Sequence, residues 1–155
     1  MAFKLLDETR IFFRHLERES AFVKLDTLFD QYYLCLMAGL IHRKLGSDKD
    51  EGTEFVGEFP GDYYQRRHEI IGLLIAAELD RKGVAEEDRH GMEALVLRYV
   101  SHQSTTNLSP DGMALLNRYA RGGFEVLQDH FKDSPRNVHT FLLEYQKLIS
   151  PHQES

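Results

Sequence analysis

The side chains that could bind a metal ion are scattered along the sequence. Glu87 and His90 have the Glu-x-x-His spacing of di-iron helical bundles, but the sequence holds no second pair of this kind. Both residues lie where a helix is expected to begin, and acidic residues are favoured there in any case. No His-Glu-x-x-His pair is present, and the one cysteine, Cys35, cannot build a thiolate site. The sequence therefore predicts neither a bound metal nor another cofactor.

Residues for nucleophilic catalysis do not form a recognisable set either. Cys35 lies within an apolar segment, where a free cysteine behaves as a small hydrophobic residue. No Gly-x-Ser-x-Gly turn is present, and the prominent serines, Ser109 and Ser134, precede prolines and are expected to cap helices. The eight histidines are dispersed and mostly have charged neighbours, so surface or capping roles are favoured. We therefore expect no catalytic activity.

The most unusual local sequence is a glycine pair inside an amphipathic helix. Apolar residues recur every three or four positions between 108 and 131, and Gly122 and Gly123 interrupt this pattern at a cost of about 1 kcal/mol each. The pair indicates a kink or a close backbone approach. Arg118, Tyr119 and Arg121 precede it, so the segment is predicted to be an interaction site for a partner protein. The same glycine pair could also support contact between two copies of the chain. The alternative is a solvated helix face.

A second basic segment suggests an alternative ligand. Arg66, Arg67 and His68 occupy the expected first turns of a helix, where an anion would gain from unpaired N–H groups. No glycine-rich phosphate loop precedes them. Together with Arg118 and Arg121, the two arginines define the alternative hypothesis, a DNA-binding regulator or adaptor. Direct DNA contact is not favoured, because the net charge is −6.

Composition bounds the class of protein. The chain has 155 residues, which fits one domain over residues 1–155, and 42% hydrophobic with 28% charged residues is typical of a globular protein. No apolar run is long enough to span a membrane, and the first residues do not resemble a signal peptide. With a single cysteine, these features predict a cytoplasmic protein that does not bind membranes.

Hydrophobic periodicity predicts an all-α fold of about six helices. Apolar side chains cover a broad arc of residues 26–45, so this segment is expected to be the central, most buried helix. Asp62 is expected to cap the next helix, and Ser109 with Pro110 to begin the helix that contains the glycine pair. The expected helices span 7–18, 26–45, 63–82, 86–103, 108–131 and 136–149.

Most of the negative charge lies in one connection, residues 46–62. This segment has six acidic residues and one lysine, together with four glycines and a proline. We expect an acidic loop in which Phe55, Val56 and Phe59 anchor the chain to the body without forming a strand. A loop of this length is often functional, so it is a second candidate contact site.

Three segments, 32–40, 59–79 and 108–127, resemble small helical accessory proteins of bacterial phage-defence loci, in particular those associated with DNA phosphorothioation (Dnd) systems. The most specific part is the pattern Leu108-Ser109, Tyr119-Ala120 and Gly122-Gly123-Phe124. The resemblance covers about residues 20–148 and transfers no catalytic residue. It implies a non-catalytic bacterial accessory protein that contacts larger proteins of the same DNA-modification or phage-defence system.

Overall fold

The computed structural model describes residues 2–19, 27–47, 52–133 and 137–150. Six α-helices occur within these residues, so the predicted all-α fold of about six helices is confirmed, and a short two-stranded antiparallel sheet accompanies the helices. The helices are α1 (Asp7–Glu19), α2 (Leu28–His42), α3 (Arg67–Arg81), α4 (Arg89–Tyr99), α5 (Pro110–His130) and α6 (Val138–Ile149). The strands are β1 (Phe3–Leu5) and β2 (Thr53–Val56), and a 3-10 helix covers Gly61–Tyr64.

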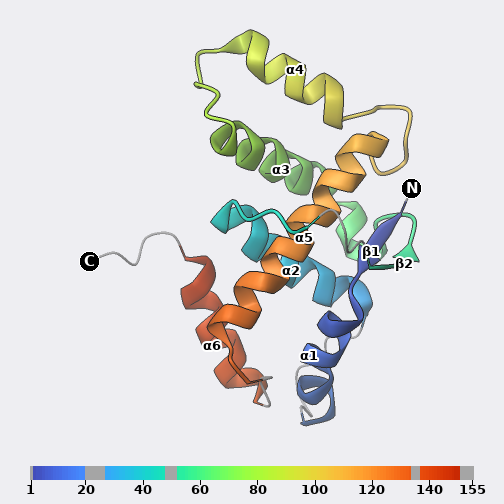
Figure 1. The fold of residues 1–155 in the computed structure, drawn as a ribbon. Coiled ribbons are helices and arrows are strands. Elements are labelled where there is room, and N and C mark those ends of the chain that lie inside the picture. Colours follow the sequence, from blue (N-terminus) through green and yellow to red (C-terminus); the bar gives the residue numbers. More distant parts are fainter. Residues whose placement is uncertain (1, 20–26, 48–51, 134–136, 151–155) are drawn as a thin grey trace.

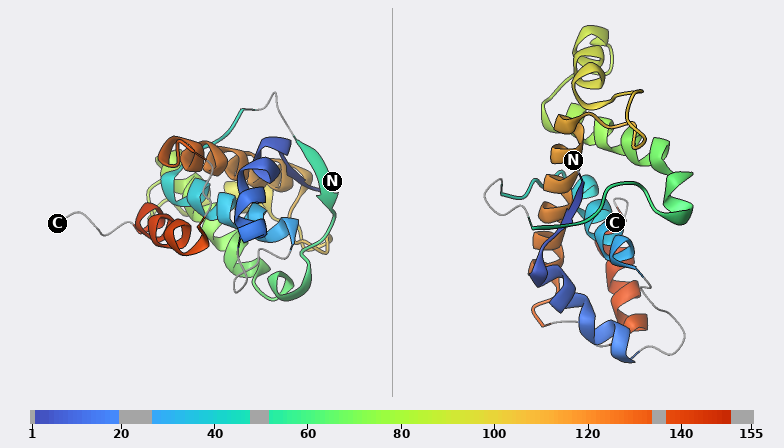
Figure 2. Two further views of the ribbon diagram at one scale, coloured as in Figure 1. Left: turned by 90° about the horizontal axis from the view of Figure 1, so that it is seen from below. Right: turned by 90° about the vertical axis from the view of Figure 1, so that its right-hand side faces the viewer.

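Two helices, α2 and α5, cross at the centre of the molecule and the others pack around them (Figure 1). Helices α1 and α6 lie at one end of this pair, whereas α3 and α4 lie at the other end, with α4 outermost (Figure 2). The segment expected to be central therefore forms a core helix, and α5 shares that position.

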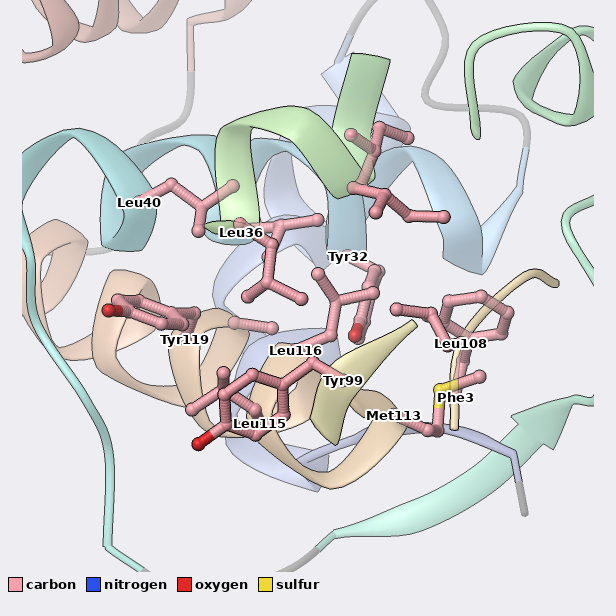
Figure 3. Packing of buried hydrophobic residues seen from close by; sticks show 14 of the residues in the cluster. Phe3, Tyr32, Leu36, Leu40, Tyr99, Leu108, Met113, Leu115, Leu116 and Tyr119 are labelled. Carbon is pink, nitrogen blue, oxygen red and sulfur yellow. The ribbon is translucent and has the colours of Figure 1, made fainter. Parts of the chain in front are cut away.

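The hydrophobic core has two parts, one toward each end of the crossing. The larger part joins α2, α3, α4 and α5 to the sheet, and Figure 3 shows Leu36 and Leu40 of α2 beside Leu116 and Tyr119 of α5. The smaller part joins α1 and α6 to the same two helices through Phe13, Phe124 and other aromatic residues. The predicted stripe of α5 is confirmed: Met113, Leu116, Ala120, Phe124 and Leu127 are buried.

The helix starts explain why these segments fold locally. Thr27 and Asp30 form a reciprocal capping box at the start of α2, with bonds of 3.1 and 3.2 Å. The Ser109 hydroxyl accepts a hydrogen bond from the Gly112 amide at 3.0 Å, and Pro110 is the first residue of α5, as predicted. Asn137 caps α6; the predicted start at Ser134 lies outside the described residues.

Two local predictions are wrong. Residues 46–62 are not a loop throughout, because Thr53–Val56 pair with Phe3–Leu5 as an antiparallel ladder with an irregularity between Phe3 and Lys4. The apolar residues of β2 alternate too briefly to signal a strand, and its partner β1 lies about fifty residues earlier in the sequence. Asp62 does not cap α3 either, since it lies in the 3-10 helix, and α3 begins after Arg66 without a side-chain cap.

Candidate functional site

The glycine pair of α5 lies where this helix crosses α2. A Cβ atom on Gly123 would overlap the carbonyl oxygen of Cys35, and one on Gly122 would overlap that of Lys44. On the opposite helix, a Cβ atom on Gly39 would overlap the carbonyl oxygen of Tyr119. The expected close backbone approach is therefore confirmed, and it occurs inside the protein between α2 and α5.

This packing corrects the idea of an exposed contact surface around the glycine pair. Tyr119 is fully buried, Arg121 is 8% exposed, and Gly122 and Gly123 are buried, while Arg118 is half-buried. The face of α5 expected to be solvated is covered by α2 and by the segment that follows α2. Because the two glycines already contact α2, they offer no surface to a second copy of the chain.

The two arginines of this segment hold the chain after α2. The Arg118 Nε donates to the Gly46 carbonyl at 3.2 Å, and the Gly46 amide donates back to the Arg118 carbonyl at 2.8 Å. The Arg121 Nε donates to the Ser47 carbonyl at 3.0 Å. A Cβ atom on Gly46 would lie 2.5 Å from the Cβ of Arg121, so Gly46 is needed for this contact. These residues fix the start of the acidic connection.

Glu78 is a fully buried carboxylate between α3 and α5. Its Oε1 accepts hydrogen bonds from the Tyr119 hydroxyl at 2.7 Å and from the Arg81 Nε at 2.6 Å. Arg81 makes a second bond to Oε2 at 3.0 Å, and the Lys82 Nζ lies 3.7 Å from the same oxygen. Burial alone raises the pKa of Glu78, but the bonds from Arg81 and Tyr119 outweigh it, so the pKa is lower than usual.

Asn117 is a buried amide that joins β1, α2 and α5. Its Oδ1 accepts hydrogen bonds from the Tyr32 hydroxyl at 2.8 Å and from the Lys4 amide at 3.1 Å. Its Nδ2 donates to the Ala2 carbonyl at 3.0 Å. The side chain thus satisfies backbone groups on the edge of β1 that faces α5, and it fixes the first strand against the central helix.

Replacing Asn117 with alanine is expected to lower the free energy of unfolding by about 2–3 kcal/mol, because the buried Tyr32 hydroxyl, the buried Ala2 carbonyl and the partly buried Lys4 amide lose their partner. Tyr32→Phe is the milder comparison, with an expected loss of about 1 kcal/mol, since Asn117 then keeps its bonds to the strand. Urea denaturation followed by circular dichroism measures both values. A loss below about 0.5 kcal/mol for Asn117→Ala would contradict the assigned role.

The arginines named for anion or DNA binding do not gather on one exposed surface. Arg67 donates from Nε to the Asn107 Oδ1 at 2.8 Å and stacks over the Tyr64 ring at 3.8 Å. Arg118 and Arg121 are engaged with the segment after α2, as described above. Of the predicted set, Arg66 and His68 are exposed at the start of α3. The three-dimensional arrangement therefore does not favour the DNA-binding alternative.

The outermost helix, α4, is weakly buried and carries exposed apolar side chains. Only Leu95 and Tyr99 of this helix are buried, within the part of the chain that the structure describes. Leu97 is 82% exposed, and Met92 and Val96 are each more than a third exposed. We call Met92, Val96 and Leu97 the α4 apolar surface; at helical spacing Leu97 lies on the side of α4 away from the buried Leu95, and Met92 and Val96 lie between Leu97 and the buried Tyr99 around the helix. It lies at the end of the molecule farthest from α1 and α6 (Figure 1).

Glu78, Asn117 and the α4 apolar surface were not predicted from the sequence. Glu78 had a usable signal, because it follows Ile71 by seven positions and Leu74 by four, which is the register of the buried face. Asn117 lies next to the buried Leu116 and had no such signal. The exposure of Met92 and Val96 had no signal either, because helical spacing does not reveal how much of a helix its neighbours cover.

The described residues were also compared with the requirements of metal binding and of membrane insertion. Among the described residues, no group of three or more His, Cys, Asp or Glu side chains is placed to hold a metal ion. In the same residues, none of the helices has the length and apolar character needed to cross a membrane. Burial raises the pKa of Cys35, so this thiol stays protonated within the core. The molecule is a mainly helical protein with a small sheet.

Comparison of the chain with protein-family models, with curated proteins and with solved structures found no match. The resemblance to Dnd-associated accessory proteins therefore stays a prediction from the sequence.

Proposed function

We propose that this protein is a non-catalytic accessory protein that binds a larger protein through the α4 apolar surface. The observation that carries the proposal is the exposure of Leu97, at 82%, on a helix that buries only two described side chains. A leucine this exposed contributes little to the fold, whereas its transfer into an interface would release about 2 kcal/mol. Leu97 projects from the side of α4 that faces away from the core, so a partner can cover it without a rearrangement of the fold.

The charges on α4 fit a protein partner better than a nucleic acid. Arg89 and Arg98 stand on the helix with Glu93 between them, and Arg98 lies 3.4 Å from Asp111 of α5. Three further acidic residues, Glu86, Glu87 and Asp88, precede the helix. A mixed rim of charges around apolar side chains is the usual composition of a protein–protein interface.

The resemblance described above indicates the class of partner. It implies larger proteins of a bacterial DNA-modification or phage-defence system, encoded near this chain. An accessory role of this kind requires a stable body that presents a contact surface, and the packed α2–α5 crossing supplies such a body. The α4 helix, at the outer end of the molecule (Figure 2), is well placed to meet a partner without disturbing that crossing.

Leu97→Glu is expected to weaken binding to the partner at least tenfold, because it would bury a charge at the centre of the contact. The free energy of unfolding is expected to change by less than about 0.5 kcal/mol, since the side chain is exposed. The measurement is a titration of each purified product of the neighbouring genes against wild type and variant, with thermal unfolding in parallel.

Leu143→Glu provides a matched control, because Leu143 is a 49% exposed leucine on α6, at the other end of the molecule (Figure 1). It is expected to bind the partner as wild type does. Loss of binding by Leu143→Glu and not by Leu97→Glu would move the contact to α6. Absence of binding by every neighbouring gene product would contradict the proposed function itself.

A further inference from the structure

The outer edge of β2 is open in the described part of the structure. The sheet has two strands, so β2 has β1 on one side only. No backbone group of Thr53–Val56 has a hydrogen bond to a described residue other than those of β1. Figure 1 shows β2 at the rim of the molecule, and the view from below in Figure 2 agrees. An open edge of this kind is a template for one more strand.

The sheet can be extended on the β2 side but not on the β1 side. Asn117 bonds the Ala2 carbonyl and the Lys4 amide, which are the groups that β1 directs toward α5. This amide therefore closes the inner edge, and β1 presents no ladder to another chain. Among the described residues, β2 therefore provides the edge at which a further strand can pair with the sheet.

An apolar hollow lies beside β2, where α2 begins. It has a volume of about 240 Å³, enough for one large apolar side chain. Its lining comes from both elements and from the turn after the strand: Thr27, Leu28, Phe29, Phe55, Val56 and Pro60. Phe29 belongs to the main core and the partly buried Phe55 packs against that core, with ring centres 6.2 Å apart, so the hollow has a packed floor.

The surroundings of β2 are acidic. Glu54 is in the strand, Glu58 follows it, and Asp62 lies in the next turn; all three side chains are exposed. Lys4 stands across from Glu54 in the strand register, and Arg66 is the next cation along the chain. The carboxylates outnumber these cations, so the edge favours a ligand with positive charge.

We propose that β2 receives an extended segment of a partner protein as a third strand, with an apolar side chain in the hollow and basic side chains beside Glu54 and Glu58. Backbone hydrogen bonds would supply affinity, and the hollow and the acidic rim would supply specificity. A second copy of this chain is disfavoured as the occupant, because pairing of two β2 strands brings the same acidic residues together. This site is separate from the α4 apolar surface.

The test uses a synthetic heptapeptide, Lys-Val-Lys-Phe-Lys-Val-Lys, labelled with a fluorophore and titrated with the full chain. A second peptide has the same sequence with methyl groups on alternate backbone nitrogens, which keeps charge and side chains but removes strand hydrogen bonds. Fluorescence anisotropy gives both dissociation constants, and amide chemical shifts locate the bound peptide. We expect binding tighter than about 100 µM for the first peptide and at least tenfold weaker binding for the second.

Two variants with the same change of charge distinguish binding at β2 from non-specific electrostatic attraction between the basic peptide and the acidic protein. Glu54→Lys is expected to weaken binding of the first peptide at least fivefold. Glu93→Lys, on α4, is expected to weaken it less than twofold. Chemical-shift changes are expected at Thr53–Val56. The proposal is overturned if both peptides bind equally, if the first does not bind at 1 mM, or if the shifts centre on α4. The proposal is also overturned if the chain forms a dimer and Glu54→Lys disrupts that dimer, because β2 would then bind a second copy of the chain.

Discussion

Gly123→Ala is expected to lower the free energy of unfolding by at least about 3 kcal/mol. The added methyl group would overlap the Cys35 carbonyl oxygen and approach the Gly39 amide nitrogen to 2.7 Å. Both are backbone atoms of α2, so no side-chain rotation can relieve the clash. The two helices would have to separate along their whole contact, which loosens the core on both sides of the crossing.

Gly72→Ala is the matched control for this substitution. Gly72 also lies within a helix, α3, but a Cβ atom there would have no neighbour within 4 Å, and the position is exposed. Alanine is therefore expected to stabilise the protein by about 0.5–1 kcal/mol, because it restricts the unfolded chain. Urea denaturation of both variants measures the two changes. Equal effects of the two substitutions on the free energy of unfolding would contradict the close backbone contact between α2 and α5 at Gly123.

Glu78→Ala is expected to be the second most damaging substitution, with a loss of about 2–4 kcal/mol. The Tyr119 hydroxyl is buried and would lose its acceptor at 2.7 Å, and the removed carboxylate would leave a cavity. Arg81 is 35% exposed and can regain part of its hydration, which places the loss below that of a fully buried ion pair.

The same carboxylate makes the stability of the protein depend on pH. Hydrogen bonds from Arg81 and Tyr119 hold the pKa of folded Glu78 below its usual value of 4.5 despite burial. The unfolded state therefore binds the proton more tightly, and the stabilisation is complete above pH 4.5. It is lost as the pH falls through the lower pKa of the folded state. Wild type should lose more stability on acidification than Glu78→Gln does.

Denaturation curves between pH 3 and pH 7 test this dependence. Glu93→Gln is the control, because Glu93 is an exposed glutamate of α4, and its removal is expected to change stability by less than about 0.5 kcal/mol at any of these pH values. Parallel pH profiles for wild type and Glu78→Gln would contradict a role for the buried carboxylate.

The sequence predicted the helices well because their signals are local. The stripe of α5 and its Ser109-Pro110 start depend on residues within a few positions of one another, and the structure has both. The strand pair could not be predicted in the same way. Thr53–Val56 is short, and its partner Phe3–Leu5 is about fifty residues away, so only the folded chain brings the two together.

The candidate site shows a different limit of sequence analysis. A glycine pair in a helix indicates close approach, but the pattern does not say whether the approaching backbone belongs to the same chain. Here it belongs to α2, which changes Gly122 and Gly123 from contact residues into packing residues. Exposure of Leu97 also had no signal, because an apolar residue on an expected helix is normally assigned to the core.

The proposal of a partner-binding α4 helix is tested most directly by photo-crosslinking. A photoreactive phenylalanine derivative is placed at position 97 or at position 143 of the full chain, which is then mixed with each neighbouring gene product and irradiated. A covalent adduct with one of these proteins from position 97, and none from position 143, is the predicted result. Adducts from position 143 alone, or equal adducts from both positions, would contradict the assignment of the contact to Leu97 and its neighbours.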